Sequence, residues 1–194
     1  MLDRTLGWWA SRERLERIIR IHGVEHLTDP AGRPVIMLTP HFVGLDAGGT
    51  VVSMHVVGCS IFSMQKNPVL NKLLYDGRMR FNPAVLLSRQ DGMRKIVKAM
   101  KEGHPFYYLP DMDFGPKESI FVPFFGVQAA TIPALSRLVR LTGARVVPVI
   151  CCQSPDGYDI EVMPAWENFP GDSVETDTAQ MNRFIESQVL RMPE

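Results

Sequence analysis

The chain has 194 residues, of which 45% are hydrophobic and 22% are charged, and its 21 basic side chains balance its 21 acidic ones. This composition excludes a disordered chain, and the length suits one domain, because about 100–200 residues per domain is usual. The zero net charge argues against a nucleic-acid-binding protein.

The balanced charge is an average over two unlike halves. Residues 1–103 carry 15 basic and 9 acidic side chains, a net charge of +6, whereas residues 104–194 carry 6 and 12, a net charge of −6. Nine basic residues lie between Lys66 and Lys101, opposed within that stretch by two aspartates. The asymmetry predicts an acidic or phosphorylated partner for one face, although a solvated helical surface has a similar composition.

Cysteine spacing and hydropathy indicate the compartment of the protein and whether it spans a membrane. Cys59, Cys151 and Cys152 lack the spacing of a disulfide framework or a zinc site, so we predict a reducing compartment and no bound metal. The longest apolar stretch, residues 51–64, includes His55 and several small polar residues, and falls short of the ~18 apolar residues that span a bilayer. We therefore expect a soluble or peripheral protein.

The first predicted element is an amphipathic helix over residues 3–21. Leu6, Trp9 and Ile18 can share one face, while arginines occupy much of the remainder. Trp8 and Trp9 are adjacent near its start. Two interpretations remain open: a surface helix packed on the core, or an interfacial helix whose indoles and arginines lie at the level of lipid headgroups.

Strand-like and helix-like segments then alternate. Short apolar runs predict strands at residues 34–39, 60–64, 84–87, 105–109, 145–150 and 158–163, the last two joined as a hairpin. Helical patterns cover residues 44–57, 68–80, 91–101, 132–141 and 177–191. This alternation predicts a single α/β domain over residues 1–194, with a mostly parallel central sheet flanked by helices. Ligands bind beyond the carboxyl ends of such strands, so chemistry is expected in the loops that follow them.

The loop after the first of these strands carries His41, and Asp46 lies five residues further on in the first turn of the next predicted helix. A carboxylate on one imidazole nitrogen fixes the tautomer and leaves the other nitrogen free to take a proton from a hydroxyl. This is the base and orienting half of a serine-hydrolase triad without the serine, and it suits a substrate hydroxyl as nucleophile. A loop histidine that caps the helix is the alternative.

Two aspartates, Asp111 and Asp113, follow the strand predicted at residues 105–109. They are candidates for holding a divalent ion between phosphates, or for orienting arginines and polar substrate groups. A turn or helix-capping role is equally compatible with the pattern.

Two further groups of side chains are candidates for substrate contacts. Arg78, Arg80 and Arg89 lie in the basic stretch and suit a phosphate or carboxylate clamp, or a solvated face. Three phenylalanines within five residues suit either the core or the wall of an acyl-chain pocket. They are Phe121, Phe124 and Phe125.

Together these pieces follow one ordered pattern. H-F-V-G-L-D after a strand is followed by S-M-Q-K-N-P, G-R-M-R and L-L-S-R-Q-D-G-M, then by Y-Y-L-P-D-M-D-F-G-P-K-E-S-I-F-V-P-F-F-G and T-G-A-R-V-V-P-V. Over essentially its whole length the chain resembles the late acyltransferases of lipid A biosynthesis, of the lauroyl and myristoyl type, within the lysophospholipid acyltransferase superfamily. The long block from Pro110 to Gly126 is the most specific part.

The resemblance implies transfer of a fatty acyl group from acyl carrier protein to a hydroxyl of a phosphorylated lipid A precursor, at the cytoplasmic face of the bacterial inner membrane. It implies His41 as general base and Asp46 as its orienting carboxylate. Arg78, Arg80, Arg89, Asp111, Asp113 and Lys117 match substrate-binding positions. It implies no cofactor other than the phosphopantetheine of the carrier, and no metal.

Members of this family extend beyond the region of resemblance on both sides. Members of the family have a hydrophobic anchoring segment before the region that resembles this chain, and a W-x-H-R-R-F-K motif after it. The chain therefore resembles an acyltransferase domain without the anchor and the C-terminal tail.

Two other functions remain open on the residues alone. A glycosyltransferase-like enzyme would use Asp111 and Asp113 to hold a metal and a nucleotide sugar, and would leave His41 without a role. A non-catalytic peripheral module would bind an acidic carrier protein or anionic lipid through the basic half of the chain.

Overall fold

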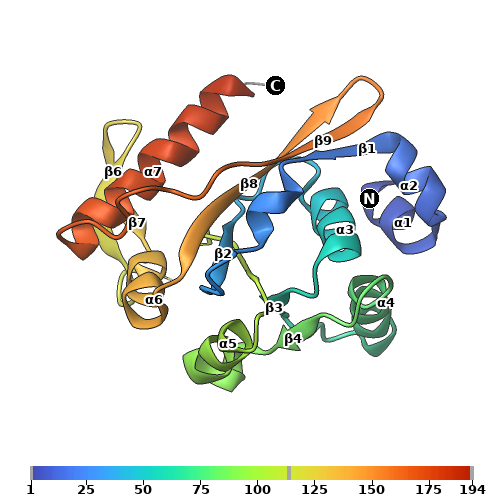
Figure 1. Ribbon diagram of the computed structural model, residues 1–194, viewed down its shortest axis with the longest axis horizontal. Coiled ribbons are helices and arrows are strands. Elements are labelled where there is room, and N and C mark those ends of the chain that lie inside the picture. Colours follow the sequence, from blue (N-terminus) through green and yellow to red (C-terminus); the bar gives the residue numbers. More distant parts are fainter. Residues whose placement is uncertain (1, 113–114, 193–194) are drawn as a thin grey trace.

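The computed structural model describes residues 2–112 and 115–192, apart from the side chains of residues 2–4 and 89. A seven-stranded sheet forms its centre, in the order β1-β9-β8-β2-β5-β3-β4 (Figure 1). Its strands are β1 (Ile19–His22), β2 (Val35–Leu38), β3 (Cys59–Ile61), β4 (Val85–Leu87), β5 (Phe106–Tyr108), β8 (Arg145–Ser154) and β9 (Gly157–Val162). Within this described sheet only β8 and β9 pair antiparallel, so the predicted α/β fold with a mostly parallel sheet is confirmed.

Helices cover both faces of the sheet (Figure 1). They are α1 (Leu2–Trp9), α2 (Arg12–Ile18), α3 (Leu45–His55), α4 (Pro68–Arg78), α5 (Gly92–Lys101), α6 (Ala134–Thr142) and α7 (Val174–Arg191), with short 3₁₀ turns η1 (Val24–Leu27) and η2 (Arg89–Asp91). No helix in the described ranges has both the length and the apolar composition needed to cross a bilayer.

Strand β2 shows how the core is divided. All four of its residues are buried, as expected for a central parallel strand covered on both faces. Val35 and Met37 pack in the cluster with α2 and α3, whereas Ile36 and Leu38 pack in the cluster with α5, α6 and α7. The alternation follows from the two-residue period of a strand.

The N-terminal segment differs from the expected single helix over residues 3–21. It forms α1 and α2, separated at Ala10 and Ser11, and then strand β1. The Ser11 side chain caps α2 by accepting a hydrogen bond from the Arg14 N–H. From Ile19 onward the chain pairs in parallel with β9, because the sheet offers backbone partners that outweigh helical periodicity.

A second, two-stranded sheet was not expected. It consists of β6 (Ile120–Phe124) and β7 (Val127–Thr131), paired antiparallel. Phe125 and Gly126 join the strands with φ of 47° and 78°, the positive values that a tight two-residue hairpin needs at both positions.

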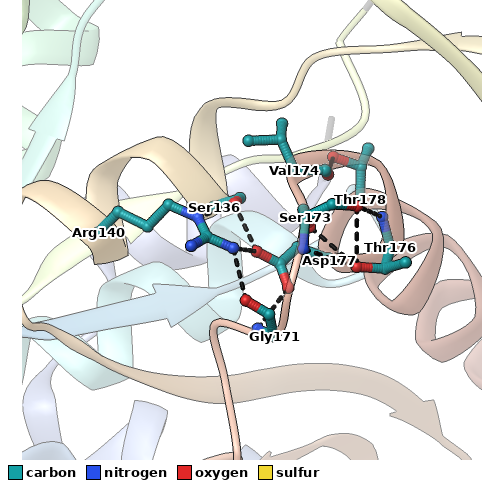
Figure 2. Close-up of polar contacts among 8 residues, drawn as sticks. All are labelled: Ser136, Arg140, Gly171, Ser173, Val174, Thr176, Asp177 and Thr178. Carbon is teal, nitrogen blue, oxygen red and sulfur yellow. Dashed lines mark hydrogen bonds and ion pairs between the residues drawn. The ribbon is translucent and has the colours of Figure 1, made fainter.

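A polar network holds α6 against the start of α7 (Figure 2). The buried Asp177 carboxylate accepts hydrogen bonds from Ser136 Oγ at 2.5 Å, Arg140 Nη2 at 2.9 Å and the Gly171 N–H at 2.6 Å. Asp177 lies in the first turn of α7, where a negative charge also interacts favourably with the helix dipole. Every carboxylate contact in this network serves the packing of the helices.

Candidate active site

His41 contacts a carboxylate at the edge of the sheet, and that carboxylate belongs to Asp111. His41 Nδ1 lies 2.7 Å from Asp111 Oδ1, and the His41 backbone N–H donates to Asp111 Oδ2 at 2.8 Å. The two side chains are 38% and 30% exposed, respectively. The contact is therefore accessible to a substrate from solvent.

The strand register explains why these two residues meet. Strands β2 and β5 are adjacent and parallel, with Leu38 opposite Tyr108, and the ladder continues through the Thr39 N–H bonded to the Tyr108 carbonyl. His41 and Asp111 each lie three residues beyond that pair. Both loops leave the same edge of the sheet, the edge at which the sequence predicts the chemistry.

The geometry determines which imidazole nitrogen can react. An ionised carboxylate only accepts hydrogen bonds, so Asp111 favours the tautomer in which Nδ1 carries the proton. The lone pair of Nε2 is then available to take a proton from a substrate hydroxyl. A carboxylate in this position also stabilises an imidazolium over a neutral imidazole. The sequence pattern alone assigned this orienting role to Asp46.

Asp46 occupies the first turn of α3, as expected. That helix begins after Gly44, whose φ of 92° and tight contact with the Tyr158 ring both favour glycine: a Cβ there would lie 2.6 Å from the ring. Asp46 lines the wall of a cavity, and the carboxylate contact to His41 Nδ1 in this structure comes from Asp111. Whether Asp46 acts on His41 stays a prediction.

A largely apolar cavity of about 130 Å³ lies between the helices and the sheet, and neither His41 nor Asp111 is among the residues that line it. Leu45 and Leu109 line it, and they lie four residues after His41 and two residues before Asp111. It continues between α1, α3, α4 and strands β3–β5. Its polar lining comes from Asp46, Thr50, Ser53, Ser60, Arg78 and Tyr107.

Tyr107 is a half-buried tyrosine in the lining of this cavity. Burial raises the pKa of its phenol well above the ordinary value of 10, with the Thr39 hydroxyl acting in the opposite direction. Its hydroxyl also lies 3.5 Å from the Leu45 carbonyl, so it links β5 to the start of α3. Tyr107 stays neutral at physiological pH and serves as a hydrogen-bonding group.

The three predicted arginines have different surroundings. Arg78 lines the cavity, and its guanidinium carbon lies 5.6 Å from the centre of the Phe62 ring. Arg80 donates to the Gly7 carbonyl at 2.8 Å and to the Ala10 carbonyl, so it fastens the segment just after α4 to the C-terminal end of α1. This internal role differs from the expected substrate contact. Arg89 lies in η2, but its side chain is outside the described part of the structure.

The remaining predicted residues lie elsewhere or cannot be placed. Lys117 lines a separate surface groove near α6, and Asp113 is outside the described residues. The acyl-pocket prediction for the three phenylalanines is not supported by their positions. Phe121 and Phe125 are exposed on the β6–β7 hairpin, Phe124 packs against the core, and none of them lines the apolar cavity.

Sequence reasoning identified Asp46 and Arg78 but missed most of the residues that line that cavity. Trp8, Gly49 and Gly77 come from three different helices, and no short motif connects them. The indole of Trp8 lies directly over Gly77, where a Cβ atom would collide with the ring. The adjacent tryptophans were a signal for interfacial contacts, but the partner of Trp8 is defined only by the fold.

Comparison with known proteins identifies the family of the chain. The sequence profile of the bacterial lipid A biosynthesis acyltransferases matches residues 5–194. The lipid A biosynthesis lauroyltransferase of Escherichia coli K12 is 33% identical over 199 residues, covering 100% of this chain and 64% of that protein. The myristoyltransferase of the same organism is 33% identical over 163 residues, covering 82% of this chain and 50% of its own length.

The fold has a relative among solved structures. The crystal structure of the 1-acyl-sn-glycerophosphate acyltransferase from Thermotoga maritima superposes with a TM-score of 0.57 at 15% identity, over 98% of this chain and 78% of that one. This likeness concerns the fold alone. The sequence matches establish more: the chain belongs to the bacterial lipid A biosynthesis acyltransferase family.

Proposed function

We propose that this protein transfers a fatty acyl group from acyl carrier protein to a hydroxyl group of a phosphorylated lipid A precursor. The observation that carries the proposal is the His41–Asp111 contact, in a chain of this family whose structure also holds an apolar cavity lined by Leu45 and Leu109. The chain spans less than two thirds of the length of these relatives, so donor and acceptor are inferred from the site's chemistry and the resemblance.

The proposed reaction needs one base and no redox chemistry. His41 Nε2 removes the proton from the acceptor hydroxyl as its oxygen attacks the carbonyl carbon of the donor thioester. The tetrahedral intermediate collapses with cleavage of the C–S bond, and the imidazolium returns the proton to the leaving thiolate of the phosphopantetheine. The products are a new ester and free carrier thiol. Asp111 holds the ring throughout.

The cavity suits the fatty chain of the donor. Its lining is mainly apolar. Two of the lining residues, Leu45 and Leu109, are close in the sequence to His41 and Asp111, respectively. At about 130 Å³ it is smaller than the ~300–1,000 Å³ typical of ligand pockets. A long acyl chain therefore requires part of the cavity lining to move. The contact between Trp8 of α1 and Gly77 of α4 is the proposed place, because it joins two separate helices.

The competing glycosyltransferase function would need Asp111 for a metal ion. Both oxygens of Asp111 are engaged by His41, one by the ring and one by the backbone N–H. This arrangement favours acyl transfer, in which His41 has a role. Transfer activity that survives strong chelation is the result expected for a metal-independent acyltransferase.

The reaction is tested by mass spectrometry of lipid A from cells with and without the full-length gene. The proposal predicts a difference of one fatty acyl group, whose mass also identifies the chain length. Identical lipid A in the two strains would refute the proposed acceptor. A purified protein that binds acyl carrier protein but never consumes its thioester would favour a non-catalytic module.

A further inference from the structure

Helix α4 packs on the domain without burying any residue. All eleven of its positions, Pro68 to Arg78, are at least partly exposed, whereas five positions of α3 are buried. Asn67 caps it by accepting from the Val69 and Leu70 N–H groups, and the proline lies in its first turn, so the helix is well formed locally. An ordinary surface helix places an apolar stripe against the core and polar residues outside.

The outward side of α4 is apolar where solvent would favour polar residues. Val69 is 68% exposed, Met64 in the preceding loop is 73% exposed, and Leu70 and Leu73 are also exposed. Trp9 of α1 is 65% exposed. Helix α1 is joined to α4 by Trp8 over Gly77 and by the Arg80 hydrogen bonds.

We call this surface the α4 face and define it by Trp9, Met64, Val69, Leu70 and Leu73. Basic side chains accompany it. Lys66 and Lys72 are exposed along the same segment, and Asp76, paired with Lys72 at 2.6 Å, is the single acidic residue between Ser60 and Arg80. The face thus combines large apolar side chains and an indole with an excess of positive charge.

We propose that the α4 face docks on an anionic lipid bilayer. Apolar side chains inserted at the acyl boundary, an indole at the headgroup level and lysines beside them form the usual combination for an interfacial helix. A second copy of the same face would bring like charges together, which disfavours self-association. A purely acidic protein partner would not explain why Met64 and Val69 are exposed.

Docking in this orientation places the cavity at the membrane. Leu74, Gly77 and Arg78 of α4 line the cavity with Trp8, so the helix that contacts lipid is also a wall of the site. An amphiphilic acceptor could then reach the site without leaving the bilayer. Access of the acceptor to the site rests on the proposed function. Binding of the α4 face to lipid can be measured without any acyl transfer.

Co-sedimentation of the purified protein with vesicles tests the proposal. The probes are vesicles of phosphatidylethanolamine with phosphatidylglycerol, and vesicles of phosphatidylcholine alone. Val69→Glu places a charge on the α4 face, and Val127→Glu is the matched control, since Val127 is 69% exposed on the β6–β7 hairpin. We expect Val69→Glu to weaken binding to anionic vesicles by about tenfold or more, and Val127→Glu to leave it unchanged. Raising the salt concentration should weaken wild-type binding.

Several results would overturn the docking proposal. They are failure of the wild type to bind anionic vesicles, equal binding to both vesicle types, or equal loss in the two variants. Loss of carrier-protein binding in Val69→Glu with vesicle binding intact would instead identify the face as a protein interface. Hydrolysis of a soluble acyl thioester, measured on the same variant, separates this outcome from failure of the proposed chemistry.

Discussion

His41 and Asp111 occupy equivalent positions in the loops that follow two neighbouring parallel strands, β2 and β5. Each lies three residues beyond the register pair Leu38–Tyr108, and their side chains meet at 2.7 Å. The central sheet thus positions the proposed base and its carboxylate through backbone hydrogen bonds, and both loops need only three residues to bring them into contact.

The first prediction concerns Asp111. Asp111→Asn keeps the size of the side chain but allows the wrong histidine tautomer and removes the charge that stabilises the imidazolium. We expect the turnover number to fall by about 10²–10⁴, with little change in KM for the donor. Asp156→Asn, in the exposed β8–β9 turn, is the control. Steady-state acyl transfer measures both.

A comparison with Asp46 separates the two carboxylates. Asp111 contacts Nδ1, so Asp111→Asn should reduce turnover more than Asp46→Asn. If the Asp46 variant loses more turnover than the Asp111 variant, Asp46 is the carboxylate that orients His41, as the sequence pattern predicts.

The second prediction concerns the cavity. Gly49 lines it from α3, and a Cβ there has room, since its nearest neighbour is Tyr107 Oη at 3.6 Å. Gly49→Leu should fill part of the space and reduce transfer from long-chain donors more than from short-chain donors. The ratio of kcat/KM for two chain lengths is the measurement. An unchanged ratio would mean that the acyl chain lies elsewhere.

The third prediction concerns Arg80, which fastens the segment just after α4 to the C-terminal end of α1 through two backbone carbonyls. Arg80→Met should lower the free energy of unfolding by about 1–3 kcal/mol, because it leaves these carbonyls without their charged donor. Arg94→Met, on the exposed side of α5, should change it little. Urea denaturation compares them. Equal stability of the two variants would contradict the structural role of Arg80 and leave substrate binding as its expected role.

The fourth prediction concerns the buried Asp177. Asp177→Ala removes the acceptor for Ser136, Arg140 and the Gly171 N–H, and should lower the free energy of unfolding by about 1.5–3 kcal/mol. Asp172→Ala is the control, because that residue is exposed in the preceding loop. Thermal unfolding should distinguish them, and similar midpoints would contradict the role assigned to the network in Figure 2.

The fifth prediction is a pH dependence. Hydrogen bonds from the Arg33 side chain, with smaller contributions from its backbone N–H and from Arg145, lower the pKa of Asp29 from 3.8 to about 2. A lowered carboxyl pKa contributes stability that is complete above the unfolded pKa and lost as pH falls through the folded one. Asp29→Asn should therefore be less stable than wild type at pH 6, and the difference should shrink between about pH 4 and pH 2. A difference constant over that range would contradict it.

The sequence predicted the alternation of strands and helices well because each segment carries its own period and end signals. Helix α4 begins after Asn67 with a proline, and α6 ends at Gly143 with a left-handed φ of 67°. Elements that depend on distant partners were missed: β1 exists because β9 lies beside it, and β6 because it turns back on β7.

The candidate site was predicted in part for the same reason. His41 and Asp111 were each recognised beyond a buried strand, but their contact depends on β2 and β5 being neighbours, which local sequence does not specify. The H-x-x-x-x-D spacing predicted Asp46 as the orienting carboxylate. Arg80 and the three phenylalanines have the right chemistry for substrate contacts, and only packing shows that the structure uses them elsewhere.

The central claim is that His41 is the general base of acyl transfer. Its most direct test is the rate of acyl transfer by His41→Ala, measured from a carrier-bound donor to a lipid A precursor after circular dichroism has established that the variant is folded. His41 is exposed, so truncation should not disturb the core. The account predicts a loss of about 10³-fold or more in turnover, and near-normal turnover would contradict it.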